Sequence, residues 1–220
     1  MPFTSEQLAR VRTIWDRIVS HPFLIQTRDG TIRPATFATW LRQDYLFVEA
    51  AIPFLAALIP KAPPKHVEPL TQSIAALYRE LELFRDRADA ADIDVTDVQP
   101  SFTNHAYIQF LLASACRESY AGAFTVLYTA EKAYYDSWMV VRRGLDRSSI
   151  WFPFVENWTG EAFAGYVQYL EGELNKLADG AGRAERTRMA ALFETTAKYE
   201  LAFWEMAATG EGWPGLDAEA

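Results

Sequence analysis

The chain has 220 residues, of which 50% are hydrophobic and 14% aromatic. A chain of this length and composition buries enough apolar surface to fold without metals or disulfides, which excludes global disorder. The net charge of -8 argues against binding to nucleic acid or anionic lipid, and the single cysteine, Cys116, excludes an internal disulfide.

The sequence predicts no targeting or membrane-spanning segment. Glu6 and Arg10 lie among the first ten residues. The most apolar run, Ala50 to Pro60, is shorter than the roughly 20 residues that a membrane span needs. We therefore expect a cytoplasmic protein with no membrane partner.

Apolar residues recur along the chain at steps of three and four, which is the pattern of amphipathic helices. In chain order, the pattern predicts helices over Thr4 to Val19, Leu41 to Ile59, Glu68 to Arg87, Phe102 to Glu118, Phe124 to Trp138, Glu161 to Leu177 and Met189 to Ala207. A proline-rich connection is expected between Pro60 and Pro69, and a polar one from Asp86 to Ser101. No convincing strand pattern occurs.

These elements predict an all-α fold, a single bundle of about seven helices. No shift in composition and no internal repeat divides the chain, so we expect one domain over residues 1–220. The tail after about residue 210 is expected to be loosely ordered.

Two of the apolar rows contain a carboxylate at a core position, Glu131 and Glu200, and Asp44 lies on the flank of a third row. A buried carboxylate is costly unless it is paired, hydrogen bonded or protonated, and burial moves a carboxyl pKa toward the range of general acids and bases. Three such acids could converge on one cavity. An acid of this kind taken alone is more often a rim residue or the partner of an arginine.

Aromatic residues accompany each acid. They are Tyr45 and Phe47 near Asp44, Tyr128, Tyr134 and Tyr135 near Glu131, and Tyr199, Phe203 and Trp204 near Glu200. Such rings can stack on a flat heteroaromatic ligand while carboxylates accept hydrogen bonds from its N–H groups. Aromatic residues at helical spacing are also common in plain cores, and both interpretations stay open.

The sequence offers no pattern for a metal or a cofactor. His21, His66 and His105 are too far apart for an i, i+4 ligand pair. The glycine-rich nucleotide motifs, the nucleophile elbow and the repeated Glu-x-x-His of diiron bundles do not occur. We therefore expect no metal and no cofactor.

Several stretches together resemble the TenA/THI-4 family, relatives of thiaminase II. They are HPF at 21–23 with the DG turn at 29–30, FATWLRQDYLFVEAAIPFLAALIP at 37–60, AEKAYYDSW at 130–138, ENWTGEAFAGYV at 156–167 and KYELAFWEM at 198–206. The resemblance covers nearly the whole chain up to about Thr209, and the QDY and YExxFW elements together are specific.

The resemblance implies a haem-oxygenase-like bundle without haem, whose central pocket binds an aminopyrimidine derived from degraded thiamin. Family members hydrolyse 4-amino-5-(aminomethyl)-2-methylpyrimidine, or its formylated form, so that the pyrimidine re-enters thiamin salvage. Asp44 matches the aspartate that holds the ring nitrogen and the exocyclic amine, and Glu200 matches a glutamate that shuttles protons. The family also implies a homo-oligomer, either a dimer or a tetramer.

The chain departs from the better-known branch of that family, in which a nucleophilic cysteine follows a proline on the middle helix. The aligned stretch here is YTAE at 128–131. The spacing of Glu131 and Tyr134 is similar to the TenA-E branch, in which a glutamate takes over. Phe47 stands where the cysteine branch has a tyrosine. The missing cysteine argues against cleavage of intact thiamin.

The sequence thus predicts an aminohydrolase or amidohydrolase acting on an aminomethyl- or formamidomethyl-pyrimidine. The predicted roles are ring orientation by Asp44, proton transfer by Glu131 and Glu200, a hydrogen bond near the reacting group from Tyr134, and pocket walls from Phe47, Tyr107 and Trp158. Two alternatives stay open, namely a non-catalytic pyrimidine-binding or regulatory protein, and a cofactor-free oxidase resembling the pyrroloquinoline quinone synthesis enzyme.

Overall fold

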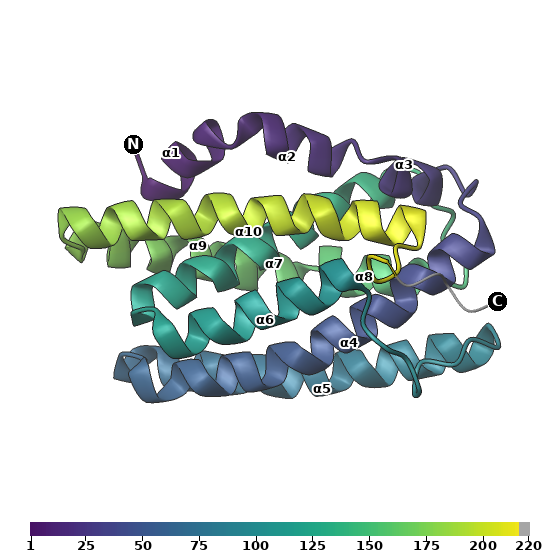
Figure 1. Cartoon of the computed structure of the whole chain (residues 1–220), viewed down its shortest axis with the longest axis horizontal. Coiled ribbons are helices and arrows are strands. Elements are labelled where there is room, and N and C mark those ends of the chain that lie inside the picture. Colours follow the sequence, from purple (N-terminus) through teal and green to yellow (C-terminus); the bar gives the residue numbers. More distant parts are fainter. Residues whose placement is uncertain (216–220) are drawn as a thin grey trace. The chain divides into compact units, whose positions relative to one another are not determined.

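The computed structural model describes residues 1–215, and every regular element within them is a helix (Figure 1). This confirms the all-α class. Ten α-helices and one short 3-10 helix lie in that range, more than the seven predicted. The predicted N-terminal helix is divided at Val11, and two further helices, of seven and eight residues, each carry a proline in the first turn. Such short helices complete too few turns to show a periodic pattern.

The helices form two compact units. Unit 1 consists of residues 1–31 and 117–201, and unit 2 consists of residues 32–116 and those from 202 onward. The prediction of one domain over residues 1–220 stays a prediction, and its last five residues lie outside the described range.

Unit 1 is built around a long helix, α7, which packs against α2, α3, α8 and α9. Its N-terminus is capped by Ser119, whose side chain accepts a hydrogen bond from the backbone N–H of Gly122. The indole of Trp15 donates to Asp136 at 3.0 Å and so joins α2 to α7. The helices of unit 1 are α1 (Phe3–Arg10), α2 (Arg12–Val19), α3 (Pro22–Arg28), α7 (Tyr120–Arg142), α8 (Phe152–Thr159), α9 (Glu161–Gly180) and most of α10 (Arg183–Thr209).

Unit 2 contains an antiparallel helix pair, α4 and α5, joined through the 3-10 helix η1 (Figure 1). The predicted proline-rich connection is shorter than expected, because α5 begins at Pro64. Proline is tolerated there, since the first N–H groups of a helix have no partner within the helix. Pro69 lies inside α5. The elements of unit 2 are α4 (Pro34–Leu58), η1 (Ile59–Lys61), α5 (Pro64–Ala90), α6 (Phe102–Arg117) and the end of α10.

One helical stretch among the described residues, Pro34–Lys61, is long and apolar enough to cross a membrane by length and composition alone, with a mean hydropathy of 1.2 in one 18-residue window. Core helices pass the same test, so the absence of a membrane-spanning segment stays a prediction. α4 packs along α5 and buries Phe37, Trp40 and Leu41 completely, as a core helix of unit 2 does.

The described part of the C-terminal tail is tied to unit 2, although the sequence predicts loose order after residue 210. The indole of Trp213 donates to the backbone oxygen of Pro100 at 3.0 Å. Its ring also contacts Phe102 and His105, with centroid distances of 5.5 and 5.3 Å. The remainder of the predicted tail, 216–220, lies outside the described residues.

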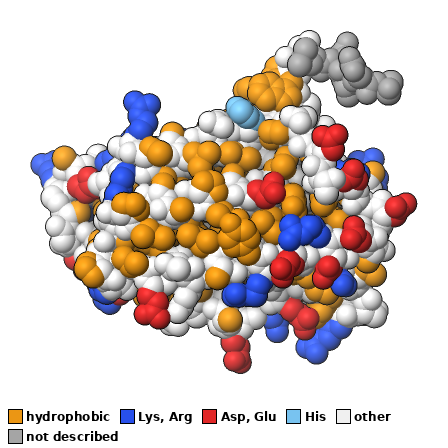
Figure 2. Space-filling view, turned by 90° about the horizontal axis from the view of Figure 1, so that it is seen from below, with side chains coloured by type: hydrophobic (Ala, Val, Ile, Leu, Met, Phe, Trp, Pro, Cys, Tyr) orange, Lys and Arg blue, Asp and Glu red, His pale blue; other side chains and the backbone are white. Residues whose placement is uncertain are grey.

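The face seen from below, where α4 and α5 lie, carries a band of apolar side chains flanked by charged ones (Figure 2). On α5, Val67 and Tyr78 are exposed, and no charged residue occurs between positions 69 and 78. Exposed apolar surface of this kind is typical of faces that another protein covers. The homo-oligomer expected from the sequence stays a prediction.

Candidate functional site

The QDY element lies in the middle of α4, and neighbouring side chains tie it to other parts of unit 2. The guanidinium of Arg42 donates to the backbone oxygen of Asp94 at 2.9 Å, and that of Arg85 on α5 donates to the hydroxyl of Tyr45 at 3.1 Å. Asp44 is 1% exposed. The predicted orienting acid is therefore a buried carboxylate on a firmly held segment.

Gln43 joins α4 to the start of α6. Its amide nitrogen donates to the backbone oxygen of Gln99 at 3.1 Å, and its amide oxygen accepts from the backbone N–H of Ser101 at 2.9 Å. The amide nitrogen of Asn104 lies 2.7 Å from the backbone oxygen of Gln43 and 2.9 Å from its side-chain oxygen. Ser101 in turn accepts from the backbone N–H of Asn104.

One turn beyond this amide contact, aromatic rings meet. The rings of Phe47 and Tyr107 have their centroids 4.7 Å apart at an angle of 40°, and Phe203 lies 5.8 Å from Phe47. Tyr107 is buried and Phe47 is half-buried. We call Gln43, Asp44, Phe47, Asn104 and Tyr107 together the α4–α6 interface.

A second group of predicted site residues lies in unit 1, where α8 packs against α7. The ring centroid of Trp158 lies 5.1 Å from that of Tyr134, in an edge-to-face arrangement. It lies 4.8 Å from the ring centroid of Trp138 and 5.4 Å from that of Phe154, on which it stacks. Glu131 precedes Tyr134 by one turn of α7 and is half-buried. We call Glu131, Tyr134, Trp138, Phe154 and Trp158 together the α7–α8 interface.

The short helix α8 holds Trp158 in place because both of its ends are fixed locally. Pro153 lies in its first turn, and Gly160 separates α8 from α9. A Cβ atom at Gly160 would come within 2.8 Å of the backbone oxygen of Glu156, so only glycine fits this sharp connection. Arg142 at the end of α7 donates to both the hydroxyl and the backbone oxygen of Thr159.

Glu200, the third predicted acid, lies on α10 and is 2% exposed. It falls on the buried face of that helix with Phe193, Thr196 and Ala197. The hydroxyl of Thr196 donates to the backbone oxygen of Leu192, so this side chain on the buried face is satisfied within the helix.

The structure thus brings the predicted residues together in two sets. Within unit 2, Phe47 contacts Tyr107 and follows Asp44 by about one turn, and within unit 1, Tyr134 contacts Trp158. Asp44 and Glu200 are buried, whereas Glu131 is half-buried. The prediction that the three acids share one pocket joins residues of both units and stays a prediction.

The sequence analysis gave no role to Asn104, nor to Gln43 beyond its place in the QDY element, although both hold the segment around Asp44. One signal was present, because Ser101 follows a proline and precedes Asn104 by three residues, as in a helix N-terminus. A long-range contact between two amide side chains leaves no such signal, since it depends on the fold.

Unit 1 also contains two tyrosines outside the predicted site, Tyr128, which is buried, and Tyr120, which is half-buried. Burial, with Glu171 and Asp136 nearby, raises the pKa of Tyr128 well above its usual value. Burial likewise raises the pKa of Tyr120, with smaller contributions from Tyr169 and Glu173. Among residues 1–215, no group of three or more His, Cys, Asp or Glu side chains is placed to hold a metal ion.

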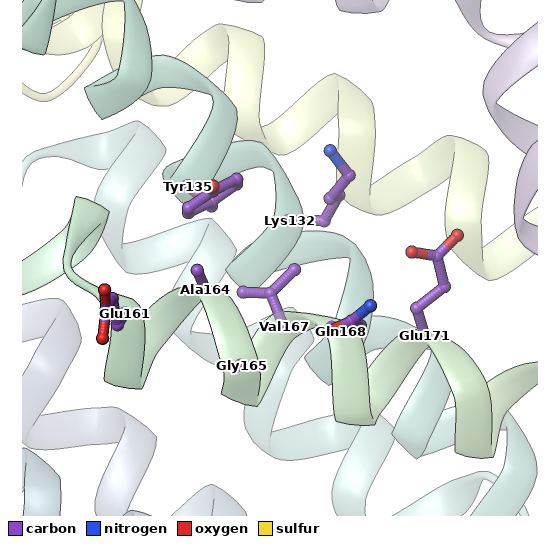
Figure 3. A pocket seen from close by; sticks show the side chains of 8 residues that line it. All are labelled: Lys132, Tyr135, Glu161, Ala164, Gly165, Val167, Gln168 and Glu171. Carbon is purple, nitrogen blue, oxygen red and sulfur yellow. The ribbon is translucent and has the colours of Figure 1, made fainter.

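A groove of about 460 Å³ lies between α7 and α9, and none of the predicted site residues lines it (Figure 3). Lys132 and Tyr135 of α7 lie on one side, while Glu161 and Glu171 mark its two ends on α9. Lys132 forms an ion pair with Asp136 at 2.6 Å. The groove is therefore separate from the α7–α8 interface, although Lys132 directly follows Glu131.

Comparison with known proteins finds relatives along the whole chain. A family model described as the TENA/THI-4/PQQC family matches residues 8–210. A probable bifunctional TENA-E protein of Glycine max is 30% identical and covers 92% of each chain. An aminopyrimidine aminohydrolase of Halalkalibacterium halodurans is 24% identical, covering 97% of this chain and 98% of that relative.

Solved structures agree with these matches. A TenA homologue from Pyrococcus furiosus is 35% identical with a TM-score of 0.90, covering 93% of this chain and 99% of that one. A domain with a heme oxygenase-like fold from Shewanella denitrificans is 16% identical with a TM-score of 0.73, covering 93% and 91% of the two chains. The second match bears on the fold alone and confirms the predicted haem-oxygenase-like class.

Proposed function

This chain belongs to the TENA/THI-4/PQQC family, and we propose that it is a hydrolase of thiamin-derived aminopyrimidines that works in thiamin salvage. The proposed substrate is 4-amino-5-(aminomethyl)-2-methylpyrimidine or its formylated form. Support comes from the relative named aminopyrimidine aminohydrolase and the relative named TENA-E. A cytoplasmic location and assembly as a homo-oligomer stay predictions.

The observation that carries this proposal is a buried carboxylate on the same helix as an aromatic ring that contacts a second ring. Asp44 is 1% exposed, and Phe47, about one turn further along α4, contacts Tyr107. A ring can stack on a flat pyrimidine, while a carboxylate accepts hydrogen bonds from its ring N–H or exocyclic amino group. We assign the orientation of the pyrimidine to Asp44.

Hydrolysis of the aminomethyl compound breaks the bond between the methylene carbon and the amino nitrogen. Water supplies the oxygen, so the products are ammonia and the hydroxymethylpyrimidine. One group must take a proton from the water, and another must give a proton to the departing amine. We assign these two transfers to Glu131 and Glu200, because carboxyl groups in unlike environments divide into base and acid. Tyr134 and Trp158 complete the proposed site.

The formylated compound needs the same groups. Water adds to the formyl carbon, the bond from that carbon to nitrogen breaks, and formate and the aminomethylpyrimidine leave. The stretch 128–131 holds no cysteine, so this scheme uses water directly and forms no thioether with the protein. Intact thiamin should therefore be cleaved much more slowly than either small pyrimidine.

The test is turnover by the purified protein. We expect ammonia from the aminomethylpyrimidine or formate from its formyl derivative, measured alongside loss of thiamin under the same conditions. Binding of a pyrimidine without turnover would support a binding or regulatory protein instead. Oxygen consumption would support an oxidase, and rapid thiamin cleavage would overturn the proposed roles of the two glutamates.

A further inference from the structure

Two buried amide side chains, Gln43 and Asn104, join the middle of α4 to the first turn of α6. They are 8% and 0% exposed. The side-chain nitrogen of Asn104 donates to both the backbone oxygen and the side-chain oxygen of Gln43. The Gln43 side chain makes two more hydrogen bonds, to Gln99 and Ser101 in the segment before α6. We call Gln43 and Asn104 the amide pair. Such a dense set of buried polar contacts is costly to break, because each broken bond leaves a buried group unsatisfied.

The orientation of both amides follows from their partners. The backbone oxygens of Gln43 and Gln99 only accept hydrogen bonds, and the backbone N–H of Ser101 only donates. The nitrogen of each amide must therefore face a backbone oxygen. The side-chain oxygen of Asn104, Oδ1, is buried and has no hydrogen-bond partner among the described residues. The two hydrogen bonds donated by Nδ2 therefore orient this side chain by themselves.

The amide pair lies one turn from the aromatic contact. Gln43 and Phe47 are four residues apart on α4, and Asn104 and Tyr107 are three apart on α6, so each couple shares a helix face. Asp44 directly follows Gln43. A shift of α4 along α6 would break the amide contacts and would move the carboxylate and the ring pair with it.

We propose that the amide pair consists of positioning residues, which set the register of α4 against α6 and so hold Asp44, Phe47 and Tyr107 in place for a bound ring. This inference rests on the proposed function for the identity of the ring. Hydrogen bonds suit the task, because they weaken steeply when their angle departs from linearity. Ring contacts tolerate a range of centroid distances and cannot set a register alone.

The test compares Gln43→Leu with a matched control in unit 1. There, Asn175 on α9 joins α1 in the same manner, accepting from the backbone N–H of Thr4 at 3.0 Å and donating to its hydroxyl at 3.1 Å. Asn175→Leu removes a two-helix amide contact that involves no proposed site residue. Both variants should melt at a lower temperature than the wild type.

Activity should separate the two variants. Misplacement of binding groups by about 1 Å can cost on the order of 10²-fold in rate. We therefore expect kcat/KM on the aminopyrimidine to fall about 10²-fold in Gln43→Leu, with KM raised as well as kcat lowered, while Asn175→Leu keeps the wild-type values. Gln43→Leu combined with Asn104→Leu should lose no more activity than the worse single variant, because both act through one contact. Equal activities for Gln43→Leu and Asn175→Leu would overturn the proposal.

A second measurement does not depend on catalysis. Amide hydrogen exchange, followed by mass spectrometry, should become faster in peptides covering 43–48 and 101–108 in Gln43→Leu, and in peptides from α1 and α9 in Asn175→Leu. If Gln43→Leu does not fold, Gln43→Asn, which keeps the amide but is one methylene shorter, takes its place. If the wild type hydrolyses no pyrimidine, the proposed function fails. The hydrogen-exchange pattern then tests by itself whether the amide pair positions α4 against α6. Unchanged exchange in 43–48 and 101–108 would overturn it.

Discussion

The α4–α6 interface and the α7–α8 interface each combine an acid, ring contacts and hydrogen bonds, but in different proportions. In the first, the amide pair ties the helices with hydrogen bonds of 2.7 to 3.1 Å, and Asp44 is buried. In the second, Trp158 meets three other rings, and Glu131 is half-buried. At this second interface, the hydrogen bonds from Arg142 to Thr159 lie at the end of α8, next to Trp158.

The difference matches the tasks proposed for the two acids. A group that orients a ligand gains from a rigid setting, which directional hydrogen bonds provide. A group that exchanges protons with water gains from partial exposure, and ring contacts can form a wall around it without fixing one geometry. Asp44 fits the first description and Glu131 the second.

The largest expected effect tests the proton-transfer role of Glu131. In Glu131→Gln, turnover of the aminopyrimidine should fall by roughly 10² to 10⁴-fold, the usual contribution of one general acid or base. The amide keeps the volume of the side chain, so ligand affinity should stay at the wild-type value. Steady-state kinetics and calorimetric titration measure the two quantities. Glu161→Gln, on the exposed end of the α7–α9 groove, is the control, and full activity in Glu131→Gln would show that this acid is structural.

The next effect tests whether rings hold the α7–α8 interface together. Trp158 is buried against Tyr134, Trp138 and Phe154, so Trp158→Ala should lower the free energy of unfolding by about 3 to 5 kcal/mol. Urea unfolding measures the change. Ile150→Ala provides the contrast, since that residue is 50% exposed and the loss of its side chain should cost less than about 0.5 kcal/mol. A similar small loss at Trp158 would mean that other contacts hold α8.

A smaller effect tests the orienting role of Asp44. Asp44→Asn keeps the size of the side chain but accepts fewer hydrogen bonds, so affinity for the aminopyrimidine should weaken by about 1.5 to 3 kcal/mol while the melting temperature changes little. Calorimetric titration and a thermal melt check the two parts. Glu49→Gln, one turn further along α4 and exposed, should bind as the wild type does. Unchanged affinity in Asp44→Asn would remove this residue from the binding site.

The smallest effect concerns the buried hydroxyl of Tyr128 in the ring-rich core of unit 1. Its pKa is raised in the folded chain, chiefly by burial. Below pH 10, roughly the ordinary tyrosine pKa, both states keep the proton. Above it the unfolded chain loses the proton first, so the free energy of unfolding falls as pH rises, by about 1.4 kcal/mol at pH 11. Tyr128→Phe should flatten this alkaline decline in urea unfolding at pH 9 to 11, and an identical decline in both proteins would contradict the assignment.

The helices were largely predictable because their signal is local. Apolar steps of three and four show in the sequence itself, and the long helices α4, α5, α6, α7, α9 and α10 all lie where that pattern indicated them. The start of α5 at Pro64 and the short helix α8 were missed, because each depends on one or two residues at a helix end. The acids were recognisable for the same local reason, since Glu131 and Glu200 interrupt apolar rows.

By itself, the sequence determined the all-α class, the family, and which acids and rings are candidates for the site. Only the tertiary structure decided that Phe47 meets Tyr107 and that Tyr134 meets Trp158, because residues far apart in the chain have no common periodic pattern. It also decided that Gln43 and Asn104 hold the segment of Asp44. Their contact joins residues 61 positions apart, and hydrogen bonds of that kind depend on helix packing rather than on local propensity.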